Sequence, residues 1–159
     1  NNLKAQNLSD KIEFISGKRP KFFIADLASL KNIKESALEF ISLDIPLHVL
    51  LNNAGLINNN RKDTVDGFEE VFSINHLAYF YLTYLLLDKL KEGTPSRIIN
   101  VSSGAHAFVK GFNFDDVNSC KFSSNAGGNL VFLDLCIAFS ITCVATKLSP
   151  FLILLRTQS

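Results

Sequence analysis

Polar residues that could hold a ligand stand directly after three short apolar runs of the sequence. Asp26 follows the first run, Asn52 and Asn53 follow the second, and Ser102 and Ser103 follow the third. Carboxylate, amide and hydroxyl groups of this kind exchange hydrogen bonds with polar ligands. In an open α/β sheet, ligands bind outside the carboxyl ends of the strands. The spacing therefore predicts one ligand site, assembled from three separate segments at one edge of a sheet.

The apolar runs predict buried strands, because they are short and do not alternate with polar residues. They cover residues 21–25, 48–51 and 97–101. Apolar residues at helical spacing predict one helix between the first two runs and a longer helix between the last two. Strands that alternate with helices in this way indicate an α/β fold with a parallel sheet covered on both faces.

Three helices are expected. They cover residues 3–16, closed by Gly17, then 30–40, and then about 68 to 90. Thr64 or Asp66 is of a type that can cap the third helix. Because most of its circumference is apolar, we expect the third helix in a core or at an interface rather than in solvent.

Composition limits the classes of protein and partner. The chain has 159 residues, 47% of them hydrophobic, and a net charge of +1, so we expect one globular domain over 1–159 and no nucleic-acid partner. Cys120, Cys136 and Cys143 have no metal-ligand spacing, so no metal is expected. The apolar segment 130–145 contains Asp134 and is shorter than a membrane span, which leaves only shallow membrane association open.

Four motifs follow one another in the order of a known family. They are Asp26-Leu27-Ala28-Ser29-Leu30, Val49-Leu50-Leu51-Asn52-Asn53-Ala54-Gly55, Ile74-Asn75-His76-Leu77 and Arg97-Ile98-Ile99-Asn100-Val101-Ser102-Ser103. Together they resemble the short-chain dehydrogenase/reductase family, specifically its retinol-dehydrogenase-like branch, over roughly residues 3–118. The resemblance implies a partial doubly wound, Rossmann-type sheet with helices on both faces.

The resemblance also implies a cofactor, NADP or NAD, and hydride transfer between a lipophilic alcohol and its carbonyl. Asp26 would lie beside the adenine, with Leu27 next to it among the cofactor-binding residues. The sheet edge against the adenosine ribose would be shaped by Asn52, Ala54 and Gly55.

The catalytic residues that the resemblance implies are Asn75, Ser103 and Lys147. Asn75 would hold a backbone kink and a water of the proton relay. Ser103 would donate a hydrogen bond to the substrate oxygen, which gains negative charge when a carbonyl is reduced. Lys147 would hold the nicotinamide ribose and lower the pKa of a tyrosine four residues earlier, the general acid.

The sequence departs from the family at that tyrosine. Its three tyrosines all precede Ser103, and Cys143 occupies the position four residues before Lys147. The apolar segment 128–142 reads as inserted sequence, either a translated intron or a divergent membrane-facing loop, and 143–156 resembles a remnant of the active-site helix. None of the eight glycines forms the family's Gly-x-x-x-Gly-x-Gly turn after a strand.

We therefore expect a truncated or mis-spliced chain that binds cofactor poorly and is inactive as written. The alternative is a non-enzymatic protein, either a degenerate product or a binding module that keeps the α/β shell. The resemblance further implies an intracellular location, cytoplasmic or associated with the endoplasmic reticulum. A homodimer through the 68–90 helix is a further expectation.

Overall fold

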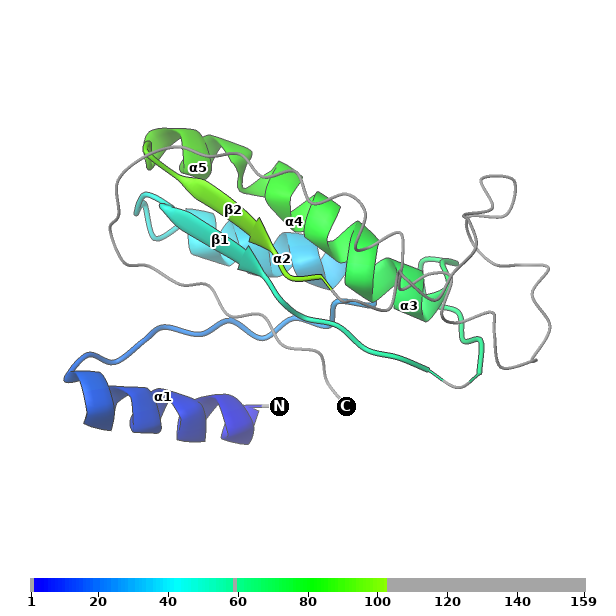
Figure 1. Ribbon diagram of the computed structural model, residues 1–159, viewed down its shortest axis with the longest axis horizontal. Helices are drawn as coiled ribbons and strands as arrows, with labels where there is room; N and C mark the ends of the chain where they lie inside the picture. The colour runs from blue at the N-terminus through cyan, green and yellow to red at the C-terminus, as the bar shows by residue number, and fades with distance from the viewer. Residues whose placement is uncertain (1, 59, 103–159) are drawn as a thin grey trace.

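The computed structural model of the chain describes residues 2–58 and 60–102 (Figure 1). The helices are α1 Asn2–Ser16, α2 Leu30–Ile41, α3 Glu70–Phe72, the π-helical turn η1 Ser73–Leu77, α4 Ala78–Leu85 and α5 Leu87–Glu92. The strands are β1 Val49–Asn52 and β2 Arg97–Asn100.

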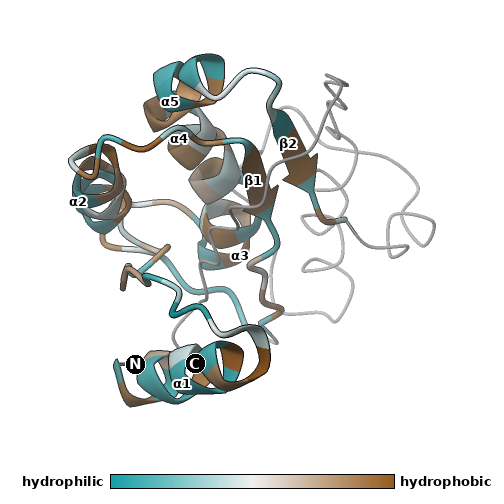
Figure 2. Ribbon diagram, turned by 90° about the vertical axis from the view of Figure 1, so that its left-hand side faces the viewer, coloured by the Kyte–Doolittle hydropathy of each residue, from teal (hydrophilic) through white to brown (hydrophobic). Residues whose placement is uncertain are grey.

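The two strands are parallel neighbours, as the sequence predicts. Their register pairs Val49 with Arg97 and Asn52 with Asn100, so both strands end at the same edge. Helices α2 and α4 lie side by side on one face of this pair (Figure 2). Parallel strands joined through helices confirm the predicted α/β class, of which the described residues form a part.

The core lies between the sheet and these two helices. It collects apolar residues from every layer, among them Ile33, Ala37 and Phe40 of α2, Leu50 of β1, and Ala78 and Leu82 of α4. Leu50 is fully buried at the centre of β1. This packing fixes the carboxyl end of β1 relative to α4, which is what a site at that edge requires.

Helix α2 begins where predicted, because its first N–H groups find side-chain acceptors. The Ser29 hydroxyl accepts from the Asn32 N–H at 3.4 Å. The Leu30 N–H donates to the Asp66 carboxylate at 2.8 Å, across 36 residues of sequence. A carboxylate at a helix N-terminus also interacts favourably with the helix dipole.

The predicted third helix is wrong in its cap and in its continuity. Asp66 caps α2 instead, and the Thr64 hydroxyl accepts from the Phe68 N–H at 3.2 Å. The actual cap is Glu69, whose buried carboxylate accepts from the N–H groups of the next helical turn. The helix then widens into η1 around Asn75 and breaks again at Leu86, where φ is −97° and ψ is 5°.

The predicted strand over residues 21–25 is also wrong: this segment is irregular and forms no sheet ladder within the described residues. A strand exists only when a neighbour supplies its hydrogen bonds, and a sequence run does not show that neighbour. The segment still packs on the core, because Phe23 meets Phe40 edge to face with ring centroids 6.1 Å apart.

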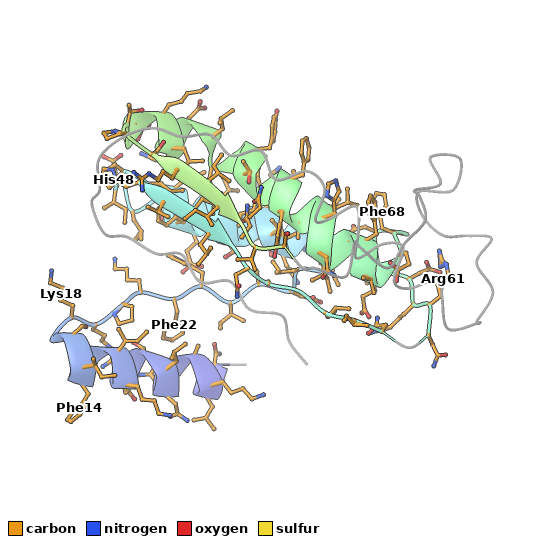
Figure 3. The ribbon with its side chains drawn as sticks, viewed as in Figure 1. Phe14, Lys18, Phe22, His48, Arg61 and Phe68 are labelled. Carbon is orange, nitrogen blue, oxygen red and sulfur yellow. The ribbon has the colours of Figure 1, made fainter. Side chains whose placement is uncertain are left out.

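Helix α1 is confirmed, and its chain reverses at Gly17, whose φ of +68° favours glycine. Arg19 then folds back to form ion pairs with Asp10 and Glu13. Phe14, 92% exposed, points away from the rest of the molecule (Figure 3).

Candidate functional site

A small open pocket lies at the carboxyl end of β1, where the sequence predicts a ligand site. It is lined by Leu27, Leu51, Asn52, Asn53, Ala54, Ala78, Tyr79 and Leu82. Three predicted cofactor-binding residues, Leu27, Asn52 and Ala54, therefore meet here. Figure 3 shows His48 near the start of β1 and Arg61 and Phe68 near the other end of the molecule, on the α3 side.

Asn52 joins the two strands and α4 at this edge. It is 4% exposed, and its amide donates to the Asn100 side-chain oxygen at 2.8 Å and to the Thr83 hydroxyl at 3.3 Å. Its carbonyl accepts from the Val101 N–H at 2.8 Å. A buried amide needs such partners, because an unsatisfied polar group in the interior is destabilising. Asn52 thus fixes the strand ends that lead into the pocket and into Ser102.

Asn75 clamps the backbone that leaves the pocket. Its side-chain oxygen accepts from the Leu56 N–H and its amide donates to the Leu56 carbonyl, both at 2.9 Å. An asparagine is well suited to this two-way contact, because its oxygen accepts while its NH₂ group donates. Gly55 lies against the same side chain, where an added Cβ would make an ordinary 3.5 Å contact with Asn75 Oδ1.

Asp26 is exposed beside the pocket and orders the turn that carries Leu27. Its carboxylate accepts from the Ala28 N–H at 3.0 Å, and its carbonyl accepts from the Ser29 N–H at 3.1 Å. Because these bonds fix the turn, Leu27 is buried while the Asp26 carboxylate remains at the surface.

A polar loop between the pocket and α3 is held by Glu70. Lys62 donates to one carboxylate oxygen at 2.6 Å, and Asn58 donates to the other. Burial alone would raise the pKa of Glu70, but these two hydrogen bonds together with the positive charge of Lys62 outweigh burial and lower it. The bond to Glu70 raises the pKa of Lys62, and the nearby charge of Asp26 adds to this.

His76 follows Asn75 in η1 and packs on Phe72. The two rings stack with centroids 5.4 Å apart. Burial disfavours the charged imidazolium and lowers the pKa of His76. These contacts indicate a structural role for His76.

Two residues at the site were missed by the sequence analysis. The Tyr79 hydroxyl donates to the Ala54 carbonyl at 2.7 Å, and Thr83 accepts from Asn52. Their recurrence at four-residue intervals after Asn75 was the available signal. Ser103, Cys143 and Lys147, together with the segments 128–142 and 143–156, lie outside the described residues.

A sequence model of the family described as short chain dehydrogenase matches residues 1–122. The chain belongs to this family. Human polyprenol dehydrogenase is 44% identical over 121 residues, which are 74% of this chain and 34% of that protein. Human retinol dehydrogenase 13 is 53% identical over 94 residues, 58% of this chain and 28% of that protein. This short chain dehydrogenase sequence thus spans about a third of the length of these relatives.

Solved structures agree on the fold of this short chain dehydrogenase chain. The short chain dehydrogenase from Shigella flexneri superposes with a TM-score of 0.61 at 23% identity, covering 83% of this chain and 49% of that one. NADPH-bound carbonyl reductase from chicken fatty liver gives 0.56 at 21% identity, covering 85% and 53%. At these identities the likeness concerns the fold.

In the ranges 2–58 and 60–102, none of the helices has the length and apolar character to cross a membrane. The same ranges bring no three His, Cys, Asp or Glu residues together as metal ligands.

Proposed function

We propose that this chain is part of an NAD(P)-dependent oxidoreductase that transfers hydride between a lipophilic alcohol and its carbonyl. The observation that carries the proposal is the pocket at the carboxyl end of β1. It brings Leu27, Asn52 and Ala54 together from segments that are far apart in the sequence. Membership of the short chain dehydrogenase family supports the assignment of cofactor-dependent hydride transfer to that pocket.

In our proposal, the adenosine half of a nicotinamide cofactor lies against the sheet edge that this small pocket marks. Its lining includes the apolar residues Leu27 and Ala54, both of them buried, and the exposed amide of Asn53, and no lining residue of this pocket is charged. Asp26, exposed on the adjoining turn, can accept a hydrogen bond from an exocyclic amine. Gly55, also exposed, leaves the backbone open to close approach by the ribose.

The bound nicotinamide would supply or accept the hydride. In our proposal Ser103, three residues beyond Asn100 in the sequence, donates a hydrogen bond to the substrate oxygen, and Asn75 keeps the Leu56 backbone in place. Lys147 holds the ribose. Cys143, where the family has its tyrosine, is a shorter group and a poor replacement for a phenol as proton donor.

The substrate class in this proposal is a lipophilic alcohol or aldehyde. It is supported by the names of two similar proteins, a polyprenol dehydrogenase and a retinol dehydrogenase. Association with the surface of the endoplasmic reticulum would bring the enzyme to such substrates. We also propose that 1–159 belongs to a single truncated dinucleotide-binding domain, and that its α4 face pairs with a second copy.

A second candidate is a non-enzymatic protein that keeps the α/β shell. The observation that favours it is Cys143, because general acid–base help contributes typically ~10²–10⁴ in rate. Without a phenol at that position, a chain that binds cofactor would reduce carbonyls at or below detection.

Titration of the purified chain with NADPH and with NADH, followed by fluorescence, tests the proposed function. We expect saturable binding with a micromolar Kd for at least one of them. Gly55→Val places a side chain at the exposed edge of the pocket and should weaken binding at least tenfold with little change in Tm. Asn7→Val, which introduces the same side chain on exposed α1, is the matched control and should bind normally.

The absence of saturable binding to either cofactor would contradict the proposed function and favour the second candidate. Where binding is present, Cys143→Tyr and Cys143→Phe separate an enzyme from a binding module. Activity on a long-chain aldehyde that rises with Tyr and not with Phe supports the enzyme, because only the phenol transfers a proton. Equal rates for the Cys, Tyr and Phe proteins would show that the proton donor lies elsewhere.

A further inference from the structure

Three polar side chains stand at four-residue intervals on the helix that covers the pocket. They are Asn75 in η1 and Tyr79 and Thr83 in α4, and the spacing places them on one face of the helix. Each is hydrogen-bonded to the segment that continues from β1. Asn75 holds Leu56, Tyr79 holds Ala54 and Thr83 holds Asn52. We call these three contacts the polar ladder.

The regular steps of the polar ladder have a geometric origin. Four residues of α-helix advance by about 6 Å. Two residues of extended chain advance by about 6.6 Å. The two spacings nearly match, so helix and segment can run side by side in opposite directions with a contact at every step.

The middle contact of the ladder is the one nearest the proposed ligand. Tyr79 and Ala54 both line the pocket, and the Tyr79 hydroxyl donates to the Ala54 carbonyl at 2.7 Å. Ala54 is buried, and its neighbour Gly55 is exposed at the pocket edge. The orientation of the Ala54–Gly55 peptide therefore depends on the hydrogen bond from Tyr79. From the sequence, Tyr79 is predicted only as part of an apolar helix.

We infer that Tyr79 is a positioning residue of the cofactor site: its hydroxyl fixes the Ala54–Gly55 backbone in the orientation that receives the adenosine part of the cofactor. The inference rests on the proposed function and deepens it. The aromatic ring contributes to packing and a phenylalanine ring would do the same, so the hydroxyl alone carries the positioning role.

The test compares Tyr79→Phe with Tyr84→Phe. Both remove one hydroxyl from the same helix, but Tyr84 is 66% exposed and lies outside the pocket lining. The first readout is amide hydrogen exchange of Leu56, whose N–H is bonded to Asn75, with Ser42 and Leu86 as reference amides. The second readout is the Kd for NADPH or NADH.

In Tyr79→Phe we expect Leu56 exchange to accelerate by about three- to tenfold, the range that loss of one neutral hydrogen bond implies. The Kd should rise by a similar factor of about three to ten. The reference amides and the Tyr84→Phe protein should remain unchanged. This combination separates local positioning from general destabilisation, which would accelerate all three amides together.

Uniform acceleration of all three amides, or no acceleration at Leu56, would overturn the inference. An unchanged Kd in a Tyr79→Phe protein that shows the local acceleration would also overturn it. If the unmodified chain binds neither cofactor, the proposed function fails, and the exchange of Leu56 then decides by itself whether Tyr79 positions this backbone.

Discussion

At the scale of single residues, the two buried asparagines of the site bond to other groups of the protein rather than face solvent. Asn52 and Asn75 are 4% and 6% exposed, and the side-chain amide of each donates a hydrogen bond to a neighbouring segment. Replacing Asn75 with aspartate would keep an acceptor for the Leu56 N–H but set a carboxylate oxygen against the Leu56 carbonyl. Asn52 and Asn75 thus shape the backbone around the candidate site and need not contact a ligand themselves.

His76 makes the stability of the folded chain depend on pH. Burial lowers its pKa from the usual 6.5, so the folded state disfavours the imidazolium that the unfolded state accepts freely. The contribution of the neutral ring is complete above the unfolded pKa and is lost as the pH falls from about 6.5 through the folded pKa. We expect the free energy of unfolding, measured with urea, to be lower at pH 5.5 than at pH 7.5.

His76→Gln is the control for this prediction, because it keeps a polar side chain that does not titrate. The decrease in the free energy of unfolding from pH 7.5 to pH 5.5 should be smaller in this variant than in the unmodified chain. The lowered pKa of Glu70 does not interfere, because its stabilising effect is lost only below its usual value of 4.5. An equal drop in both proteins would contradict the assignment to His76.

At the scale of elements, the end of α5 is pressed against the segment that leads into β1. A Cβ added to Gly93 would lie 2.3 Å from the Leu47 carbonyl oxygen, which is backbone and cannot rotate away. The contact is also tied by a bond from Leu47 N–H to the Lys89 carbonyl at 3.2 Å. Gly93→Ala should therefore lower the free energy of unfolding by about 1–3 kcal/mol, the usual range for overpacking.

Gly55→Ala is the matched control for Gly93→Ala, since its added Cβ makes only a 3.5 Å contact. Chemical denaturation of both variants checks the prediction. A Gly93→Ala protein as stable as Gly55→Ala would mean that α5 and Leu47 can separate without loss.

Some of the helices and strands could be predicted from the sequence and others could not. Helix α2 and strand β1 were predicted because their apolar spacing reflects burial, and β2 was predicted from its β-branched run although its residues are only partly buried or exposed. The strand at 21–25 was predicted wrongly because pairing depends on a neighbour. Asp66 was assigned to the wrong helix because a carboxylate of the right type does not reveal which N–H lies within reach, here that of Leu30. For the site, residue types located the pocket, and the partners of Asn75 and Tyr79 needed coordinates.

At the scale of the whole molecule, the described part of the chain exposes an apolar face along α4 and α5. Phe80, Tyr84 and Leu87 recur at the spacing of one helix face, and Phe80 is 68% exposed. We expect this face to pair with a second copy of the chain. Phe80→Glu would place a charge in that contact, and should weaken self-association in sedimentation equilibrium at least tenfold, about 1.4 kcal/mol.

Leu38→Glu is the control for the dimer prediction, because Leu38 is also exposed but lies on α2. It should leave the association constant unchanged. A monomer at all concentrations, or equal weakening by both variants, would show that the α4 face is not the contact.

The contacts of the polar ladder depend on two repeat distances, one along the helix and one along the extended chain, that are similar but not equal. They therefore match over only a limited length. Helix and extended chain differ by about 0.6 Å per step, so the offset accumulates along the ladder. The contacts measure 2.9 Å at Asn75, 2.7 Å at Tyr79 and 3.3 Å at Thr83, the last being the longest. A fourth contact would fall out of register. One residue inserted between Asn52 and Leu56 would shift this segment relative to its partners on the helix. The length of the segment is therefore constrained more tightly than its residue types.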